Sequence, residues 1–494
     1  MKKKTFIFLT TIITLCIGCL PSDFDQFKKA SLDFVSNDKK IDQKEFEDLL
    51  EQISISDDIG FQQFKDNKGQ IDNLKVVSYL LKFFISKKNE IGIEDIWQPE
   101  SEITKTKPFN INVFLENSAS MDGYVKGVTE FETAIYNLLG DFKITGICDS
   151  LNLNYINKSI PYSKQNALAP DIQDFIEKLE PSIFRQRGGD RSVSDLKNVL
   201  NTVLKSVNDK NLAVLISDFV FSPGSKANAQ DYLNNQGVGI KIDFAEKIKS
   251  YDLATVVIQL ESNFNGLYYD KSDRPISINS KRPYYIWIIG NTKQVTEILE
   301  KKILDNVKGG YKNRLVFQSI KKTNNPTYKI LSKATYGSFN RAEIGKGVIS
   351  DASESKGIES NGLFGFNLAI DFSNSMQDPK FYNDTSNYRL SNNSYLLEIE
   401  TINGQNDASP SGYSHLLKLK TKSLRDENLR IDVIGNLPTW VLTSTSYDDS
   451  NILIDEKEKE KTFGFKFLME GVKDAFYPKS NSNSLNSVSI TIKK

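Results

Sequence analysis

The sequence has 494 residues, and its 63 lysines and arginines balance its 63 aspartates and glutamates. A neutral chain lacks the basic excess with which proteins bind the phosphate backbone, so we expect no nucleic-acid partner. The single histidine, His415, argues against Ser–His or Cys–His catalysis and against a His-ligated zinc site, and we expect it in an exposed polar loop. A chain of this length predicts about three domains.

The first 18 residues have the features of a bacterial export signal. Lysines at positions 2 to 4 precede an uncharged, mostly apolar run over residues 5–17. This run is shorter than the ~20 residues that span a bilayer. It ends in Leu15-Cys16-Ile17-Gly18-Cys19, which resembles the lipobox of bacterial lipoproteins, although Cys16 stands where leucine is usual. The resemblance implies that residues 1–18 are a signal peptide and that Cys19 carries lipid (diacylglycerol and palmitate). An ordinary secretory signal or an N-terminal membrane helix is the alternative.

The residue after Cys19 bears on the membrane that would hold the protein. It is Leu20 and not aspartate, the residue that commonly signals inner-membrane retention in lipoproteins. By this resemblance we expect an outer-membrane lipoprotein, with residues 22–25 as a candidate acidic tether for export to the cell surface. The expected partner is therefore an envelope or extracellular protein.

Residues 19–100 read as a lipid-anchored helical module followed by a linker. Two segments, beginning at Phe34 and Phe64, carry Phe, Asn, Ile and Asp at the same offsets, and an amphipathic helix follows each. They resemble a degenerate pair of EF-hands. Phe replaces the first carboxylate in both copies, and the twelfth position is Glu45 in one copy and Lys75 in the other, so we do not expect calcium binding. A chance similarity between two helix-turn-helix pieces is the alternative.

Residues 109–305 alternate between apolar strand patterns and helix patterns. This alternation predicts a doubly wound parallel sheet with helices on both faces, a Rossmann-type α/β domain. The strands are predicted at residues 112–115, 143–148, 212–216, 253–260 and 284–289. The helices are predicted at residues 131–139, 171–179, 194–207, around 244–248 and at 292–304.

Residues 313–494 have a different pattern, in which short alternating runs are separated by Asn, Ser, Asp and Gly. This pattern predicts an antiparallel β domain, either one sandwich or two small domains. The runs lie at residues 363–372, 395–401, 416–420, 429–434 and 488–492. One helix is predicted over residues 466–475.

Three polar loops stand out in the α/β region: two follow strands, where open sheets bind ligands, and the one between them precedes the amphipathic helix predicted at residues 194–207. The first is Glu116-Asn117-Ser118-Ala119-Ser120, the second spans residues 188–192 and the third is Ser217-Asp218. Together they resemble the metal-ion-dependent adhesion site of the von Willebrand factor A (VWA) family. The resemblance implies a Mg²⁺ site whose open position accepts a carboxylate from a partner protein. The ligands it implies are Glu116, Ser118, Ser120, Asp190, Ser192 and Asp218.

The sequence departs from the family pattern at two of these loops. Glu116 stands where the family has aspartate, and the second loop offers Asp190 or Ser192 in place of threonine, with Arg191 between them. A VWA-like fold whose metal site is inactive is therefore the alternative.

The pattern as a whole favours a non-enzymatic binding protein, held at a membrane and engaging a partner through a VWA-like face. One alternative is a carboxylate-dependent enzyme such as a glycan hydrolase, with Asp371 and Glu398 or Glu400 in the β domain. Another is a purely structural spacer. Asp371 also opens a second D-x-S-x-S motif, which we interpret as a strand end because no amphipathic helix follows it.

Overall fold

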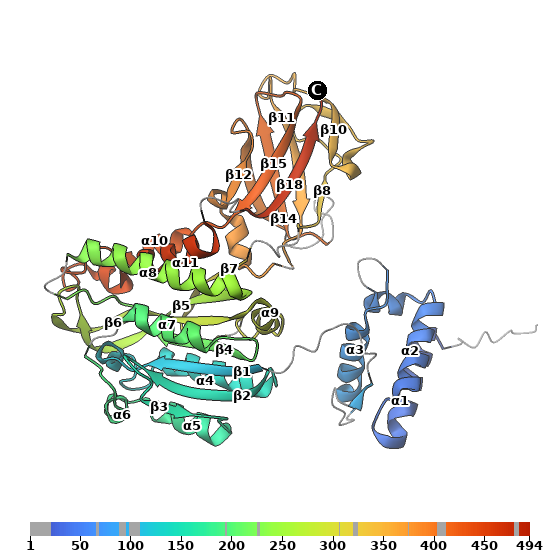
Figure 1. Cartoon of the computed structure of the whole chain (residues 1–494). Helices are drawn as coiled ribbons and strands as arrows, with labels where there is room; N and C mark the ends of the chain where they lie inside the picture. Colours follow the sequence, from blue (N-terminus) through green and yellow to red (C-terminus); the bar gives the residue numbers. More distant parts are fainter. Residues whose placement is uncertain are drawn as a thin grey trace, which may run out of the picture. The chain divides into compact units, whose positions relative to one another are not determined.

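The computed structural model forms two compact units, residues 1–105 and 106–494 (Figure 1). The predicted signal peptide, Cys19 and the linker segment 98–108 lie outside the residues that the structure describes. The described residues are 21–65, 69–87, 95–97, 109–192, 195–224, 228–305, 307–319, 325–373, 375–402, 412–478 and 484–494.

The first unit is helical, as predicted. An Asp42–Glu45 capping box starts α2, in which each side chain accepts a backbone N–H from the other residue. The helices pack around an aromatic core that includes Phe27, Phe46 and Phe64. The elements are α1 (Asp23–Asp38), α2 (Gln43–Ile55), η1 (Ile59–Phe64) and α3 (Asn73–Ser86).

The bridges formed by Ile41 and Ile71, the isoleucines of the two EF-hand-like segments, do not join one segment to the other. Ile41 forms a parallel bridge with Ile96, and Ile71 forms an antiparallel bridge with Lys65. The twelfth-position side chains make local bonds, because Glu45 accepts the Asp42 N–H at 3.0 Å and Lys75 donates to the Lys65 carbonyl at 2.8 Å. Glu45 therefore supports the start of α2, whereas Lys75 ties α3 to the segment before it.

The second unit contains a seven-stranded sheet in the order β3-β2-β1-β4-β6-β5-β7. Figure 1 shows α7 and α8 on one face of this sheet and α4 on the other. The strands are β1 (Phe109–Glu116), β2 (Cys148–Ile156), β3 (Tyr162–Lys164), β4 (Asn211–Ser217), β5 (Leu253–Tyr269), β6 (Pro275–Asn291) and β7 (Tyr311–Gln318). The helices are α4 (Glu130–Ile144), α5 (Ala169–Glu177), α6 (Pro181–Gln186), α7 (Leu196–Ser206), α8 (Ala229–Ser250) and α9 (Thr292–Glu300).

The α/β class is confirmed, but the prediction of an all-parallel sheet is wrong. Only β2, β1 and β4 run parallel as neighbours, whereas β3, β6, β5 and β7 each join an antiparallel pair. The reason lies in β5 and β6, which form one long hairpin. The residues between the two predicted strands are polar enough to read as a loop, yet they continue the same pairing.

A second error concerns β2, which was predicted over residues 143–148. The structure extends α4 to Ile144 and begins β2 at Cys148. Asparagines interrupt the apolar pattern of β2, but their amides are satisfied internally: Asn152 donates to Asn112 Oδ1 at 2.8 Å and Asn154 to the Val113 carbonyl at 3.0 Å. These bonds allow polar residues in a buried strand.

The C-terminal region forms separate, mainly antiparallel sheets, and strands cover all five predicted runs. The five-stranded sheet has the order β12-β15-β18-β10-β9, with one parallel pair, β10 and β18, and the four-stranded sheet has the order β13-β14-β11-β8. The strands are β8 (Tyr328–Ile330), β9 (Ser338–Asn340), β10 (Val348–Ser353), β11 (Phe364–Ile370), β12 (Tyr388–Leu390), β13 (Leu396–Thr401), β14 (His415–Thr421), β15 (Glu427–Ile434) and β18 (Ser484–Ile492).

His415 is not the exposed loop residue that the sequence suggested. It begins β14, is 2% exposed and packs edge-on against Phe372 and Tyr382. Its Nδ1 shares a hydrogen bond with Ser414 Oγ at 2.8 Å, and burial lowers its pKa. The polar run before it hid the start of the strand.

Between β15 and β18 the chain returns to the seven-stranded sheet. This return segment holds α10 (Thr439–Thr443), β16 (Thr445–Ser446), η8 (Glu456–Glu460), β17 (Thr462–Phe463) and α11 (Phe465–Phe476). The Phe465 ring stacks on Tyr285 of β6 with centroids 4.2 Å apart. Gln259 of β5 donates to Ser444 Oγ at 2.7 Å. The α/β body is therefore completed by residues distant in sequence.

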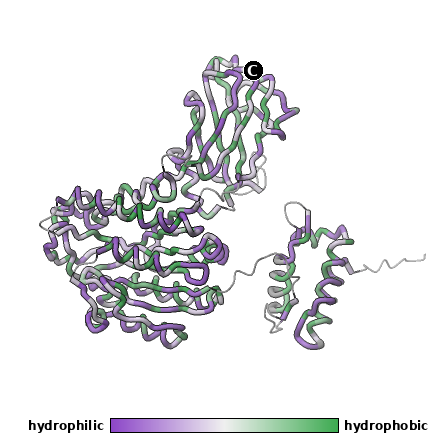
Figure 2. Tube along the Cα trace, in the orientation of Figure 1, coloured by the Kyte–Doolittle hydropathy of each residue, from purple (hydrophilic) through white to green (hydrophobic). Residues whose placement is uncertain are grey.

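Apolar residues run along the central strands of this sheet, most clearly in β4, which is buried from Leu212 to Ser217 (Figure 2). Within the ranges that the structure describes, no helix combines the length and apolarity needed to span a membrane.

The contact between α8 and α11 generates the first prediction. A Cβ on Gly471 would lie 2.5 Å from the Gly237 carbonyl oxygen, whereas a Cβ on Gly140 of α4 would meet nothing within 4 Å. We expect Gly471→Ala to lower the free energy of unfolding by about 1–3 kcal/mol through overpacking. Gly140→Ala should raise it by about 0.5–1 kcal/mol. Urea unfolding measures both, and equal effects would contradict close packing at Gly471.

Candidate functional site

The parallel neighbours β1 and β4 end side by side at one edge of the sheet. Leu115 pairs with Ile216, which brings Glu116 next to Ser217 and Asp218. The loop after β1 carries Ser118 and continues into η3 (Ala119–Gly123). The first and third polar loops predicted from the sequence are therefore adjacent in space.

Two carboxyl groups are buried at this edge. Glu116 is 2% exposed and Asp218 is 4% exposed. The Ser217 hydroxyl donates to Glu116, and Asp218 Oδ1 accepts the Val220 N–H at 3.2 Å. Burial, with the repulsion of Glu116 added, raises the pKa of Asp218 to about 7. Two neighbouring buried carboxylates are costly unless a proton or a cation compensates them.

Arg282 supplies part of that compensation, and sequence reasoning missed it. Its guanidinium is 1% exposed, and its positive charge acts to lower the pKa of Asp218. The guanidinium donates to the carbonyls of Lys459 and Lys461 at 3.0 and 3.3 Å and lies 4.2 Å from the centre of the Tyr268 ring. Nothing in the polar run around Arg282 distinguishes it from a surface arginine.

The backbone after Asp218 is held in an uncommon conformation. Phe219 has φ of +52°, in the left-handed region that residues other than glycine rarely adopt. Its ring stacks on Trp287 with centroids 4.8 Å apart, and its N–H donates to Ser217 Oγ at 2.8 Å. Packing and hydrogen bonding thus fix the turn that carries Asp218.

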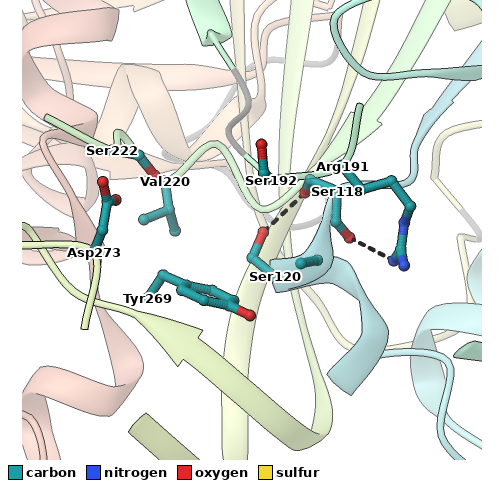
Figure 3. A pocket seen from close by; sticks show the side chains of 9 residues that line it. Ser118, Ser120, Arg191, Ser192, Val220, Ser222, Tyr269 and Asp273 are labelled. Atoms are coloured by element: carbon teal, nitrogen blue, oxygen red, sulfur yellow. Dashed lines mark hydrogen bonds between the residues drawn. The ribbon is translucent and has the colours of Figure 1, made fainter. Parts of the chain in front are cut away.

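Ser118 and Ser120, on the loop that follows Glu116, line a polar cavity of about 140 Å³, whereas Glu116 and Asp218 themselves are not among its lining residues (Figure 3). Ser118 Oγ and Ser120 Oγ are 3.0 Å apart on its wall, and Ser120 acts to lower the pKa of Asp218. The cavity is lined by Ser118, Ala119, Ser120, Arg191, Ser192, Val220, Ser222, Tyr269 and Asp273. All three predicted serines therefore meet at one cavity.

Asp190 does not join them. Its carboxylate is exposed, pairs with Lys158 at 2.5 Å and accepts the N–H and hydroxyl of Ser192 at 3.0 and 2.6 Å. Lys158 and Ser192 hold its pKa well below the usual range. The second loop thus contributes the Ser192 hydroxyl to the cavity, whereas the Asp190 carboxylate is engaged by Lys158.

Arg191 fastens the second loop to the first. Its guanidinium donates to the carbonyls of Asn117 and Ser118 at 2.6 and 3.1 Å and forms an ion pair with Asp122. Gly189 makes this approach feasible, because its φ is +80° and a Cβ there would lie 2.3 Å from Asn157 Nδ2. The positive charge of Arg191 is therefore balanced within the wall.

The residues present fit a hard cation in part. Glu116 and Asp218 offer charge, and Ser118 and Ser120 offer hydroxyl oxygens, a set that suits Mg²⁺ because this ion keeps several waters. Asp190 does not fit. In the part of the chain that the structure describes, no three His, Cys, Asp or Glu side chains are grouped to hold a metal, so any metal here would depend on serine and water oxygens.

The other carboxylates singled out from the sequence are engaged locally. Glu398 and Glu400 on β13 pair with Lys420 and Lys418 on β14. Asp371 accepts the Ser373 N–H at 2.9 Å. The thiol of Cys148 is half-buried, and burial raises its pKa to about 11.

Comparison with protein-family models, with curated proteins and with solved structures found no match to this chain. A functional assignment therefore depends on the geometry of this cavity and on the sequence.

The carboxyl pair gives the second prediction. With a folded pKa near 7 and an unfolded value of 3.8, Asp218 holds a proton in the native state that the unfolded chain releases. Wild-type stability should therefore fall between pH ~4 and ~7, by at most about 1.4 kcal/mol per pH unit. Asp218→Asn should remove this fall. Its stability relative to wild type should therefore be higher at pH 8 than at pH 5.

Urea unfolding across this pH range checks the prediction. Asp149→Asn, at an exposed carboxylate on β2, is the matched control and should keep the wild-type pH dependence. A wild-type slope in Asp218→Asn would contradict the native-state protonation.

Proposed function

We propose that the second unit contains a VWA-like domain that binds a protein partner through the face formed by the loops after β1 and β4. One observation supports this most: Glu116 and Asp218 are buried at adjacent strand ends, and Ser118 and Ser120, from the loop that follows Glu116, line a cavity. In open α/β sheets, ligands bind in the crevice at such strand ends. The two larger C-terminal sheets would form a sandwich-like domain offering a second contact surface.

The proposal includes a Mg²⁺ ion at this face. Glu116, Asp218, Ser118 and Ser120 would hold it, with Ser192 at the rim. When bound, the ion would supply a Lewis-acidic position for an acidic side chain of the partner. Its charge would also relieve the repulsion between Glu116 and Asp218. A metal-free face is the alternative, in which a proton on Asp218 does the same.

We further propose that the protein is an outer-membrane lipoprotein anchored through Cys19. The support is the lipobox-like segment ending at Cys19 and the presence of leucine, and not aspartate, at position 20. A single acyl chain binds membranes marginally, whereas several chains hold stably. The partner would then be an envelope or extracellular protein.

The metal part of the proposal predicts a loss of binding. The double variant Ser118→Ala/Ser120→Ala should abolish Mg²⁺ binding in calorimetry, because it removes both hydroxyl ligands. Ser222→Ala removes a hydroxyl from the same cavity but outside the proposed ligand set, and it should bind Mg²⁺ like wild type. Unchanged binding in the double variant would overturn the ligand assignment.

The anchor predicts a chemical modification. Intact-mass analysis of protein from bacterial membranes should show cleavage after Gly18 and an acylated Cys19. Cys19→Ser should remain uncleaved and unacylated, whereas Cys16→Ser should still be processed. Acylation of Cys19→Ser, or a mature chain beginning elsewhere, would refute the anchor.

A further inference from the structure

The far wall of the cavity belongs to a hairpin that the VWA resemblance does not include. The strand β6 pairs with β4 only over Tyr285–Ile289, and β5 pairs with β7 only as far as Leu260. Beyond those points β5 and β6 pair with each other alone, up to Tyr269 and Pro275. The end of this hairpin brings Tyr269 and Asp273 to the cavity, opposite Ser118 and Ser120 (Figure 3).

The hairpin is held firmly in this place. A Cβ on Gly266 would lie 2.6 Å from Gly123 Cα, so the hairpin backbone packs directly on η3. Farther along the same strand, Tyr268 donates to the buried carboxylate of Asp449 at 2.5 Å, and Asp449 also accepts the Lys271 N–H at 3.0 Å. The hairpin that forms this wall is therefore held in place by η3 and by Asp449 of the return segment.

The turn at its tip is built around a different aspartate. The buried carboxylate of Asp270 accepts the backbone N–H groups of Ser272 and Arg274, both at 2.9 Å, and pairs with the Arg274 guanidinium at 2.5 Å. This leaves Asp273 with φ of +58° and its side chain toward the cavity (Figure 3). Across from it, a Cβ on Gly224 would lie 3.1 Å from the Asp273 carboxylate, so glycine leaves room beside that group.

Three basic groups near Asp273 are engaged with other carboxylates, as far as the described residues show. Arg274 pairs with Asp270, Lys271 pairs with Asp448 at 2.7 Å, and Arg191 pairs with Asp122. Within the part of the chain that is described, the Asp273 carboxylate receives no hydrogen bond and no ion pair. The Ser222 hydroxyl lies beside Asp273 on the same cavity and can accept a further hydrogen bond, whereas the Tyr269 hydroxyl points toward Ser120 (Figure 3).

We infer that Asp273 is a specificity-determining residue of this face and binds a basic side chain, lysine or arginine, of the partner. The inference rests on the proposed binding face and adds a ligand class to it. One carboxylate with the neighbouring Ser222 hydroxyl as a second acceptor matches an ammonium or guanidinium group, which brings only donors. A divalent metal at Asp273 itself would lack further carboxylates there.

The test uses the full chain and a lysine side-chain probe, N-acetyl-lysine-N-methylamide, titrated by saturation-transfer-difference NMR. N-acetyl-norleucine-N-methylamide, which has no charge, is the matched ligand control. We expect saturable binding of the lysine probe only, weakening as salt is raised. Asp273→Asn should bind it about fivefold or more weakly. Asp273→Glu should restore binding, and Asp149→Asn should match wild type.

Equal binding of the lysine probe by wild type and Asp273→Asn, or equal binding of both probes, would overturn the inference. Mg²⁺ calorimetry on the same variants separates it from the proposed metal site. Asp273→Asn should keep Mg²⁺ binding, because Asp273 is outside that ligand set. If wild type binds no Mg²⁺ while lysine binding still requires Asp273, the metal proposal fails and this inference stands.

Discussion

The burial of two carboxyl groups at neighbouring strand ends is the constraint on which the candidate site and the segments around it depend. Glu116 and Asp218 are brought together by the pairing of β1 with β4, which apolar packing in the sheet imposes. Their mutual repulsion has to be offset inside the protein. The surrounding structure contributes to this with the Ser217 hydroxyl and the buried guanidinium of Arg282, and the raised pKa of Asp218 favours its protonated form.

Arg282 links the compensation of these two carboxyl groups to the return segment of the chain. A guanidinium that is fully buried requires acceptors for its own N–H groups. Here they are the carbonyls of Lys459 and Lys461, in the return segment between β15 and β18. The site and the return segment therefore depend on each other, although they are far apart in sequence. The same segment provides Asp449, which holds the hairpin through Tyr268.

Much of the fold could be predicted from the sequence because apolar periodicity reports burial directly. The strand β4 and the helix α7 follow from uninterrupted patterns. The strand β2 did not, because its asparagines are satisfied by neighbours that periodicity does not reveal. Strand direction was wrong for a related reason. A hairpin such as β5–β6 looks like two strands and a loop when its outer half is rich in polar residues and only one of its two faces is buried.

The candidate site, like the fold, could be predicted from the sequence only in part. Glu116, Ser118, Ser120 and Asp218 follow strands directly, so their meeting point could be inferred from strand ends alone. Asp190 is engaged by Lys158, and the sequence does not reveal this ion pair because it forms between loops that are not adjacent in sequence. Arg282, Tyr269 and Asp273 reach the site through an antiparallel hairpin, which an all-parallel sheet does not contain. The error in strand direction and the omission of the far wall are thus one error, since the strand pairing that makes the sheet mixed also encloses the cavity.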